Sequence, residues 1–93
     1  MKTLKINGEA FTLKPIKEDS MTKHGESVEY MVYDADGEFV ANASVIRKLH
    51  HSCKEKGYEA NDGVVYDNLD EAVFASVAEK TDYDANDCWW EFA

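Results

Sequence analysis

Proline, cysteine and long apolar runs are scarce in this chain. Its 93 residues include one proline, Pro15, and two cysteines, Cys53 and Cys88. Two cysteines far apart in sequence do not make a disulfide framework, so we expect reduced thiols. No apolar run approaches the roughly 18 residues that a membrane-spanning helix requires. These absences argue against a disulfide-rich scaffold and against a membrane protein. Hydrophobic residues make up 44% of the chain, which suffices for one small core.

Positive charge is also scarce, and its deficit is uneven. Ten lysines and arginines stand against nineteen aspartates and glutamates, for a net charge of −9. Residues 57–93 contain ten acidic residues and one basic residue, Lys80, so this segment alone matches the net charge of the chain. A field of this sign argues against direct nucleic-acid binding and against anionic membranes, and it favours either a basic partner or plain solubility.

Length and the N-terminal segment suggest one cytoplasmic domain. Ninety-three residues without a linker or an internal repeat are typical of one domain, so we assign residues 1–93 to a single unit. The first five residues are not followed by the apolar stretch of a signal peptide. We therefore expect a cytoplasmic protein.

Two hairpins are predicted in the first half. Asn7-Gly8 is a strong two-residue turn signal, and pairing across it places four apolar side chains on one face: Leu4, Ile6, Phe11 and Leu13. Pro15 is expected to permit little further pairing. Residues 17–27 are polar and predict a loop that contains His24. Residues 28–33 and 38–41 predict the second hairpin, around a turn at residues 34–37.

Two helices are predicted in the second half. The first begins near Asn42 or Ser44 and stops at Gly57, because Val45, Ile46, Leu49 and Cys53 recur at helical spacing. Residues 58–63 predict a turn region and residues 64–66 a short strand.

The second helix is expected over residues 69–80, capped by Asn68, with a buried arc of Leu69, Val73, Phe74, Val77 and Ala78. An acidic loop at residues 81–87 and a last strand at residues 88–92 follow. The fold class predicted by this order is α+β, a mostly antiparallel sheet of four to six strands with two helices packed on one face.

Catalytic motifs are absent from the sequence. The chain has no phosphate-binding loop, no GxGxxG motif and no HExxH motif. His50 and Cys53 are a weak nucleophilic pair, because no orienting residue or oxyanion turn accompanies them. We expect no enzymatic activity and no cofactor.

Metal ligation has one candidate. His50 and Cys53 lie three residues apart on a predicted helix and face the same way, but a tetrahedral zinc site also needs Cys88 or His24. Residues 34–38 resemble a calcium loop in composition only, because the glycine falls too early and no glutamate closes the loop. We predict no metal ligands and keep a small zinc-binding domain as an alternative.

The acidic second half contains the candidate interface. Carboxylates fixed in turns and at a helix start can dock in a groove built for phosphates, and tyrosine and tryptophan are favoured interface anchors. In a strand Trp89 and Trp90 point opposite ways, so one should be core. The predicted partner-binding residues are Asp67, Asp70, Glu71, Asp82, Tyr83, Asp84, Asp87 and Trp89.

The sequence favours a non-enzymatic binding protein. Its predicted role is to occlude a basic, nucleic-acid-binding surface of a partner protein. Size, acidity and the lack of catalytic residues are typical of phage-encoded inhibitors of the anti-CRISPR and anti-restriction type, and the likeness rests on those properties alone. Besides the zinc-binding alternative, a structural or regulatory homodimer joined through an edge strand stays open, so the oligomeric state is monomer or homodimer.

Overall fold

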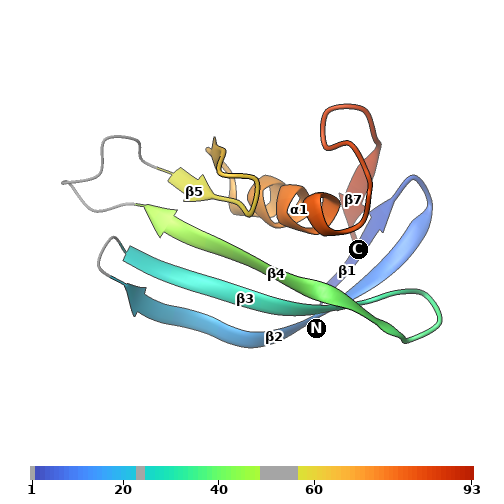
Figure 1. Ribbon diagram of the computed structural model, residues 1–93, viewed down its shortest axis with the longest axis horizontal. Coiled ribbons are helices and arrows are strands. Elements are labelled where there is room, and N and C mark those ends of the chain that lie inside the picture. The colour runs from blue at the N-terminus through green and yellow to red at the C-terminus, as the bar shows by residue number, and fades with distance from the viewer. Residues whose placement is uncertain (1, 23–24, 49–56) are drawn as a thin grey trace.

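A curved antiparallel sheet encloses one helix. The computed structural model describes residues 2–22, 25–48 and 57–93. Their elements are, in order, β1 (Lys2–Ile6), β2 (Glu9–Thr22), β3 (Gly25–Tyr33), β4 (Phe39–Lys48), β5 (Gly57–Glu59), β6 (Val65–Tyr66), α1 (Leu69–Lys80) and β7 (Trp90–Phe92). The sheet order is β6-β5-β4-β3-β2-β1-β7, and all neighbours are antiparallel. Figure 1 shows α1 lying against one face of this sheet.

The helix carries the chain from one edge of the sheet to the other. The strands before it form a simple meander, so β6 is one outer strand and β7, which pairs with β1, is the other. Only the connection from β6 to β7 must pass from one edge of the sheet to the other. α1 makes that crossing against β4, β5 and β6. No helix among the described residues is both long and apolar enough to cross a membrane.

The predicted fold class is wrong in its number of strands and helices. The described residues form a seven-stranded half-barrel with one helix, where we expected four to six strands and two helices. Residues 42–48, predicted to begin the first helix, belong to β4. Residues 49–56, the rest of that helix, lie outside the described residues.

Pairing with β3 explains why this segment is extended. The turn after Tyr33 sets Phe39 to Arg47 opposite Tyr33 to Glu26, so the β3 backbone is satisfied by this segment. Ala43 and Val45 alternate inward to the core, and β-branched residues such as Val45 and Ile46 fit a pleated surface well. The strand alternation therefore outweighs the helical spacing.

Bulges bend the long strands around the helix. The expectation that Pro15 limits pairing is wrong, because β2 continues opposite β3 from Pro15, facing Tyr30, to Thr22, facing Gly25. Register shifts on either side of Lys17 absorb the irregularity. Bulges increase twist and curve a sheet, which here forms the hollow for α1. The predicted loop over residues 17–27 is therefore also wrong, except that residues 23–24 lie outside the described residues.

The first hairpin and the helix α1 are confirmed. Ile6 pairs with Glu9 and Leu4 with Phe11, and Asn7 takes φ 50° and Gly8 φ 88°, as a type I′ turn requires. The four apolar side chains that the hairpin pattern placed on one face are all at most 3% exposed. α1 spans the predicted residues 69–80.

Hydrogen bonds to Asn68 begin the helix. Its side-chain oxygen accepts from the backbone N–H of Asp70 at 2.8 Å and of Glu71 at 3.3 Å. The second hairpin turn is confirmed as well, because Gly37 donates its N–H to the carbonyl of Asp34. β6 and β7 fall where short strands were predicted.

A buried polar contact fixes the helix against β4. Ser76 is fully buried in α1, and its hydroxyl donates to the carbonyl of Ser44 at 2.8 Å and accepts from the N–H of Asn61 at 2.9 Å. The side chain of Asn61 in turn bonds the N–H and the hydroxyl of Ser44. No β5 residue is paired with Ser44, so its backbone N–H and carbonyl form hydrogen bonds with the side chains of Asn61 and Ser76 instead.

Gly57 should tolerate no side chain. A Cβ built there would lie 2.5 Å from the carbonyl oxygen of Tyr66, and its φ is 145°. We expect Gly57→Ala to lower the free energy of unfolding by roughly 2 kcal/mol or more. Gly37→Ala is the matched control, because φ there is 81° with no atom near the added carbon. Urea unfolding measures both, and equal losses would contradict the predicted contact.

Candidate functional site

The segment after α1 is fastened to the first hairpin. Asn7 donates its N–H to the carbonyl of Trp89 at 2.8 Å, and its side chain accepts the N–H of Trp89 at 2.9 Å. The hydroxyl of Tyr83 donates to the carboxylate of Glu9, and its ring packs edge-on against Phe11 with centroids 6.3 Å apart. The acidic loop therefore has a defined position against β1 and β2.

The two adjacent tryptophans point in opposite directions, as the strand pattern predicted. Trp90 stacks on Phe74 of α1, with ring centroids 4.7 Å apart and planes 7° apart, and Phe92 meets it edge-on. Trp89 points the other way and is 57% exposed. An exposed tryptophan beside acidic residues is a typical interface anchor.

The predicted partner-binding acids form two groups. Asp67, Asp70 and Glu71 lie at the start of α1, whereas Asp82, Asp84 and Asp87 follow its end. All six are exposed. A helix of 12 residues separates the groups by roughly 18 Å along its axis. The structure therefore brings Tyr83 and Trp89 together with the second group only.

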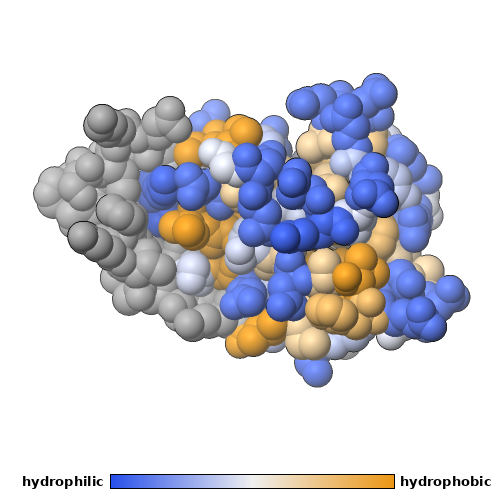
Figure 2. Space-filling view, in the orientation of Figure 1, coloured by the Kyte–Doolittle hydropathy of each residue, from blue (hydrophilic) through white to orange (hydrophobic). Residues whose placement is uncertain are grey.

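Few of the acidic residues of 57–93 form ion pairs with the described residues. Lys2 reaches Asp70 with its ammonium nitrogen 3.6 Å from the carboxylate, and Lys48 pairs with Glu59 at 2.9 Å. The other acidic residues of 57–93 make no ion pair with the described part of the chain. Figure 2 shows hydrophilic residues over the helix and the loop after it. Within the described ranges, most of the negative charge of this surface is therefore not paired with a lysine or arginine.

Backbone contacts hold some carboxylates in place. Asp62 accepts the N–H of Val64 at 2.9 Å and the hydroxyl of Tyr66 at 2.9 Å. Asp84 accepts the N–H of Asn86 at 2.9 Å. Such turns fix the position of a charge without neutralising it.

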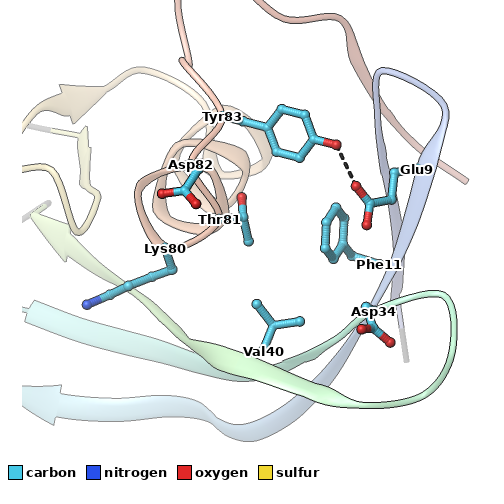
Figure 3. A pocket seen from close by; sticks show the side chains of 8 residues that line it. All are labelled: Glu9, Phe11, Asp34, Val40, Lys80, Thr81, Asp82 and Tyr83. Carbon is cyan, nitrogen blue, oxygen red and sulfur yellow. Dashed lines mark hydrogen bonds between the residues drawn. The ribbon is translucent and has the colours of Figure 1, made fainter.

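A cleft of about 500 Å³ lies beside the second group, between the end of α1 and the two hairpin turns. Figure 3 shows Glu9, Phe11 and Tyr83 on one side of it and Val40 beneath. In Figure 2 apolar residues lie between the helix and the turn after β3. The lining residues are Glu9, Phe11, Asp34, Val40, Lys80, Thr81, Asp82 and Tyr83.

Sequence reasoning found two of these residues, Asp82 and Tyr83, and missed the others. Glu9 and Asp34 belong to different hairpins, and only the folded sheet brings both beside the end of α1. Their positions next to the two hairpin turns could have identified them. The β1–β2 and β3–β4 turns lie at the same end of the sheet, so acidic residues beside these turns lie near each other. From the sequence, Asp34 was interpreted as part of a hairpin turn and of a rejected calcium loop, and not as part of an interface.

Burial and nearby carboxylates together raise the pKa values of two side chains in this segment, Tyr83 and Cys88. The hydrogen bond to Glu9 and, next, burial raise the pKa of Tyr83. Burial first, and then the charges of Asp84 and Asp87, raise the pKa of the Cys88 thiol. Cys88 is therefore mostly protonated near neutral pH, which makes it a poor nucleophile.

The zinc-binding alternative is not tested by the described residues. His24, His50 and Cys53 lie outside the described residues. Within the described ranges no three His, Cys, Asp or Glu side chains group as metal ligands would. Cys88, the remaining candidate, is half-buried.

Comparisons of this chain with protein-family models, with curated proteins and with solved structures found no match.

Tyr66 should make stability depend on pH in the alkaline range. Burial first, and then its hydrogen bond to Asp62, raise the pKa of Tyr66 from 10.0 to about 12. Because the folded pKa is raised, this contribution to stability is complete below pH 10 and is lost as the pH rises towards 12. The stability difference between wild type and Tyr66→Phe should shrink between pH 9 and pH 11.5 in urea unfolding.

Tyr33→Phe is the control for that measurement, because the Tyr33 hydroxyl contacts the sulfur of Met31 rather than a carboxylate. A difference for Tyr66→Phe that stays constant, or grows, over this pH range would contradict the assignment.

Asp82 is held in a backbone conformation that favours glycine. It follows the helix end at Thr81 with φ 65°. We expect Asp82→Gly to raise the free energy of unfolding by about 0.5–1 kcal/mol, because the left-handed conformation costs an L-residue energy that glycine avoids. Asp82→Asn removes the charge and keeps the side chain, so the difference between the two variants in thermal unfolding isolates the backbone effect. An Asp82→Gly variant less stable than Asp82→Asn would contradict this backbone effect.

Proposed function

We propose that this chain is a non-enzymatic binding protein whose acidic surface covers a basic, nucleic-acid-binding surface of a partner protein. The observation that carries the proposal is the group of exposed acids after α1, which make no ion pair with the described residues and lie beside an exposed tryptophan. Negative charges fixed on a rigid surface attract a positive site over a distance and orient the encounter.

The loop after α1 is the centre of the proposed interface. Its acids Asp82, Asp84 and Asp87 lie with Tyr83 and Trp89 on a segment tied to the first hairpin by Asn7 and Glu9. Little ordering is then required on binding, and a preorganised surface loses less entropy. Asp67, Asp70 and Glu71 extend the negative field at the other end of α1.

Trp89 supplies the apolar part of that interface. Interfaces combine a desolvated aromatic anchor with a polar rim. The backbone of Trp89 is held by two hydrogen bonds to Asn7, which place this residue at the surface next to the acids. Occlusion of a phosphate-binding groove by this combination accounts for both the charge and the exposed ring without any catalytic residue.

Charge reversal should separate the interface from general acidity. The protein is used to capture partners from a bacterial lysate at low and high salt. We expect retention of a nucleic-acid-binding protein that decreases with salt, and a loss of at least about tenfold in its affinity for the Asp84→Lys, Asp87→Lys double variant.

The matched control is Asp36→Lys, Glu38→Lys, which changes the net charge equally at exposed positions in the turn before β4. Circular dichroism and urea unfolding check that both variants fold. Equal loss in both variants would attribute retention to net charge. The proposal would be contradicted if the Asp84→Lys, Asp87→Lys variant bound as tightly as wild type. It would also be contradicted if no protein were retained at either salt concentration.

A further inference from the structure

The cleft beside α1 has an apolar floor and an aromatic wall. Phe11 from β2 and Val40 from β4 line it, and the ring of Tyr83 closes one side (Figure 3). Phe11 and Tyr83 are held edge-to-face, and the Tyr83 hydroxyl is anchored on Glu9. An open space of about 500 Å³ bounded by fixed rings is suited to a flat or elongated side chain.

Carboxylates with spare acceptor capacity surround that floor. Glu9 and Asp34 lie on the hairpin side and Asp82 on the helix side in Figure 3. Glu9 accepts one hydrogen bond, from Tyr83, through Oε1, and Asp34 accepts its two through Oδ1. The second oxygen of each, and both oxygens of Asp82, accept no hydrogen bond from the described residues. These oxygens can accept from a cationic donor.

The end of the helix adds to the negative field. Lys80 and Thr81 line the cleft where α1 stops, and the carbonyl end of a helix carries partial negative charge. Lys80 is the one cation among the lining residues, and Figure 3 shows its ammonium group extending away from Glu9 and Asp34. The space between the rings and the carboxylates is thus left to a cation from outside.

The aromatic rings of Phe11 and Tyr83 favour the guanidinium group of arginine over the ammonium group of lysine. A guanidinium is planar, weakly hydrated, stacks on aromatic faces and donates two parallel hydrogen bonds to a carboxylate. An ammonium is a compact, strongly hydrated charge that gains little from a ring wall in an open site. We propose that this cleft seats an arginine side chain of the basic partner, an inference that deepens the proposed function and rests on it.

A single-arginine peptide tests the cleft without any partner protein. Acetyl-Gly-Arg-Gly-amide and its lysine counterpart are titrated into the ¹⁵N-labelled chain at low salt. We expect chemical-shift changes from the arginine peptide centred on Phe11, Val40 and Tyr83, and binding of the lysine peptide weaker by about threefold or more.

Two triple variants with equal charge change separate the cleft from the general field. Glu9→Gln, Asp34→Asn, Asp82→Asn keeps side-chain shape and turn acceptors, and should weaken arginine-peptide binding at least about tenfold. Glu38→Gln, Glu79→Gln, Glu91→Gln removes three exposed charges that do not line the cleft, and should weaken binding less than about twofold. The ¹⁵N spectra of both variants confirm folding.

Three results would overturn the inference. They are an absence of shifts at the cleft, equal weakening in the two triple variants, and equal binding of the lysine peptide. The peptide titration needs no partner protein, so its failure would overturn the arginine site alone. The proposed function is tested separately by the lysate capture. Conversely, arginine binding in the cleft with no protein retained from the lysate would remove the proposed function and leave the site.

Discussion

The burial of the middle of α1 on all sides is the constraint on which the rest of the structure depends. Residues 72–78 are consecutive in sequence and all are buried, so nearly two full turns of the helix have no exposed face. A flat sheet covers one side of a helix only. The sheet must therefore curve, and the bulges in β2 and at the β3–β4 pairing supply the bend. Ala72, Ala75 and Ala78 are small enough to permit the close approach.

The same constraint places the surface that we propose as functional. A helix enclosed along its middle can present charge only at its ends and in the segments joined to it, which is where the exposed acids lie. Because α1 stops at Lys80, the chain must return to β1 as a loop, and that loop forms one wall of the cleft. The core geometry and the interface are thus two aspects of one packing arrangement.

Local signals were sufficient for much of the fold. The Asn7-Gly8 turn, the alternation in β1 and β2, and the Asn68 cap each depend on neighbours in sequence, and each was confirmed. The strand at residues 42–48 could not be found this way, because its helical spacing is overridden by pairing with β3, a tertiary contact. The cleft was missed for a related reason: Glu9 and Asp34 meet Tyr83 only once the sheet has curved. The acids themselves were visible in the sequence, but their division between the two ends of α1 was not.

The pairing of β7 with β1 has a consequence for how the molecule is made. Leu4 faces Phe92 across this ladder, so the contact closes almost the whole length of the sequence. Contacts between such distant residues form slowly, because the entropy of loop closure opposes them before any packing is gained. During synthesis the outer edge of β1 has no strand to pair with until residues 90–92 have been added. An open edge recruits strands from other molecules, so pairing with β7 protects β1 from aggregation.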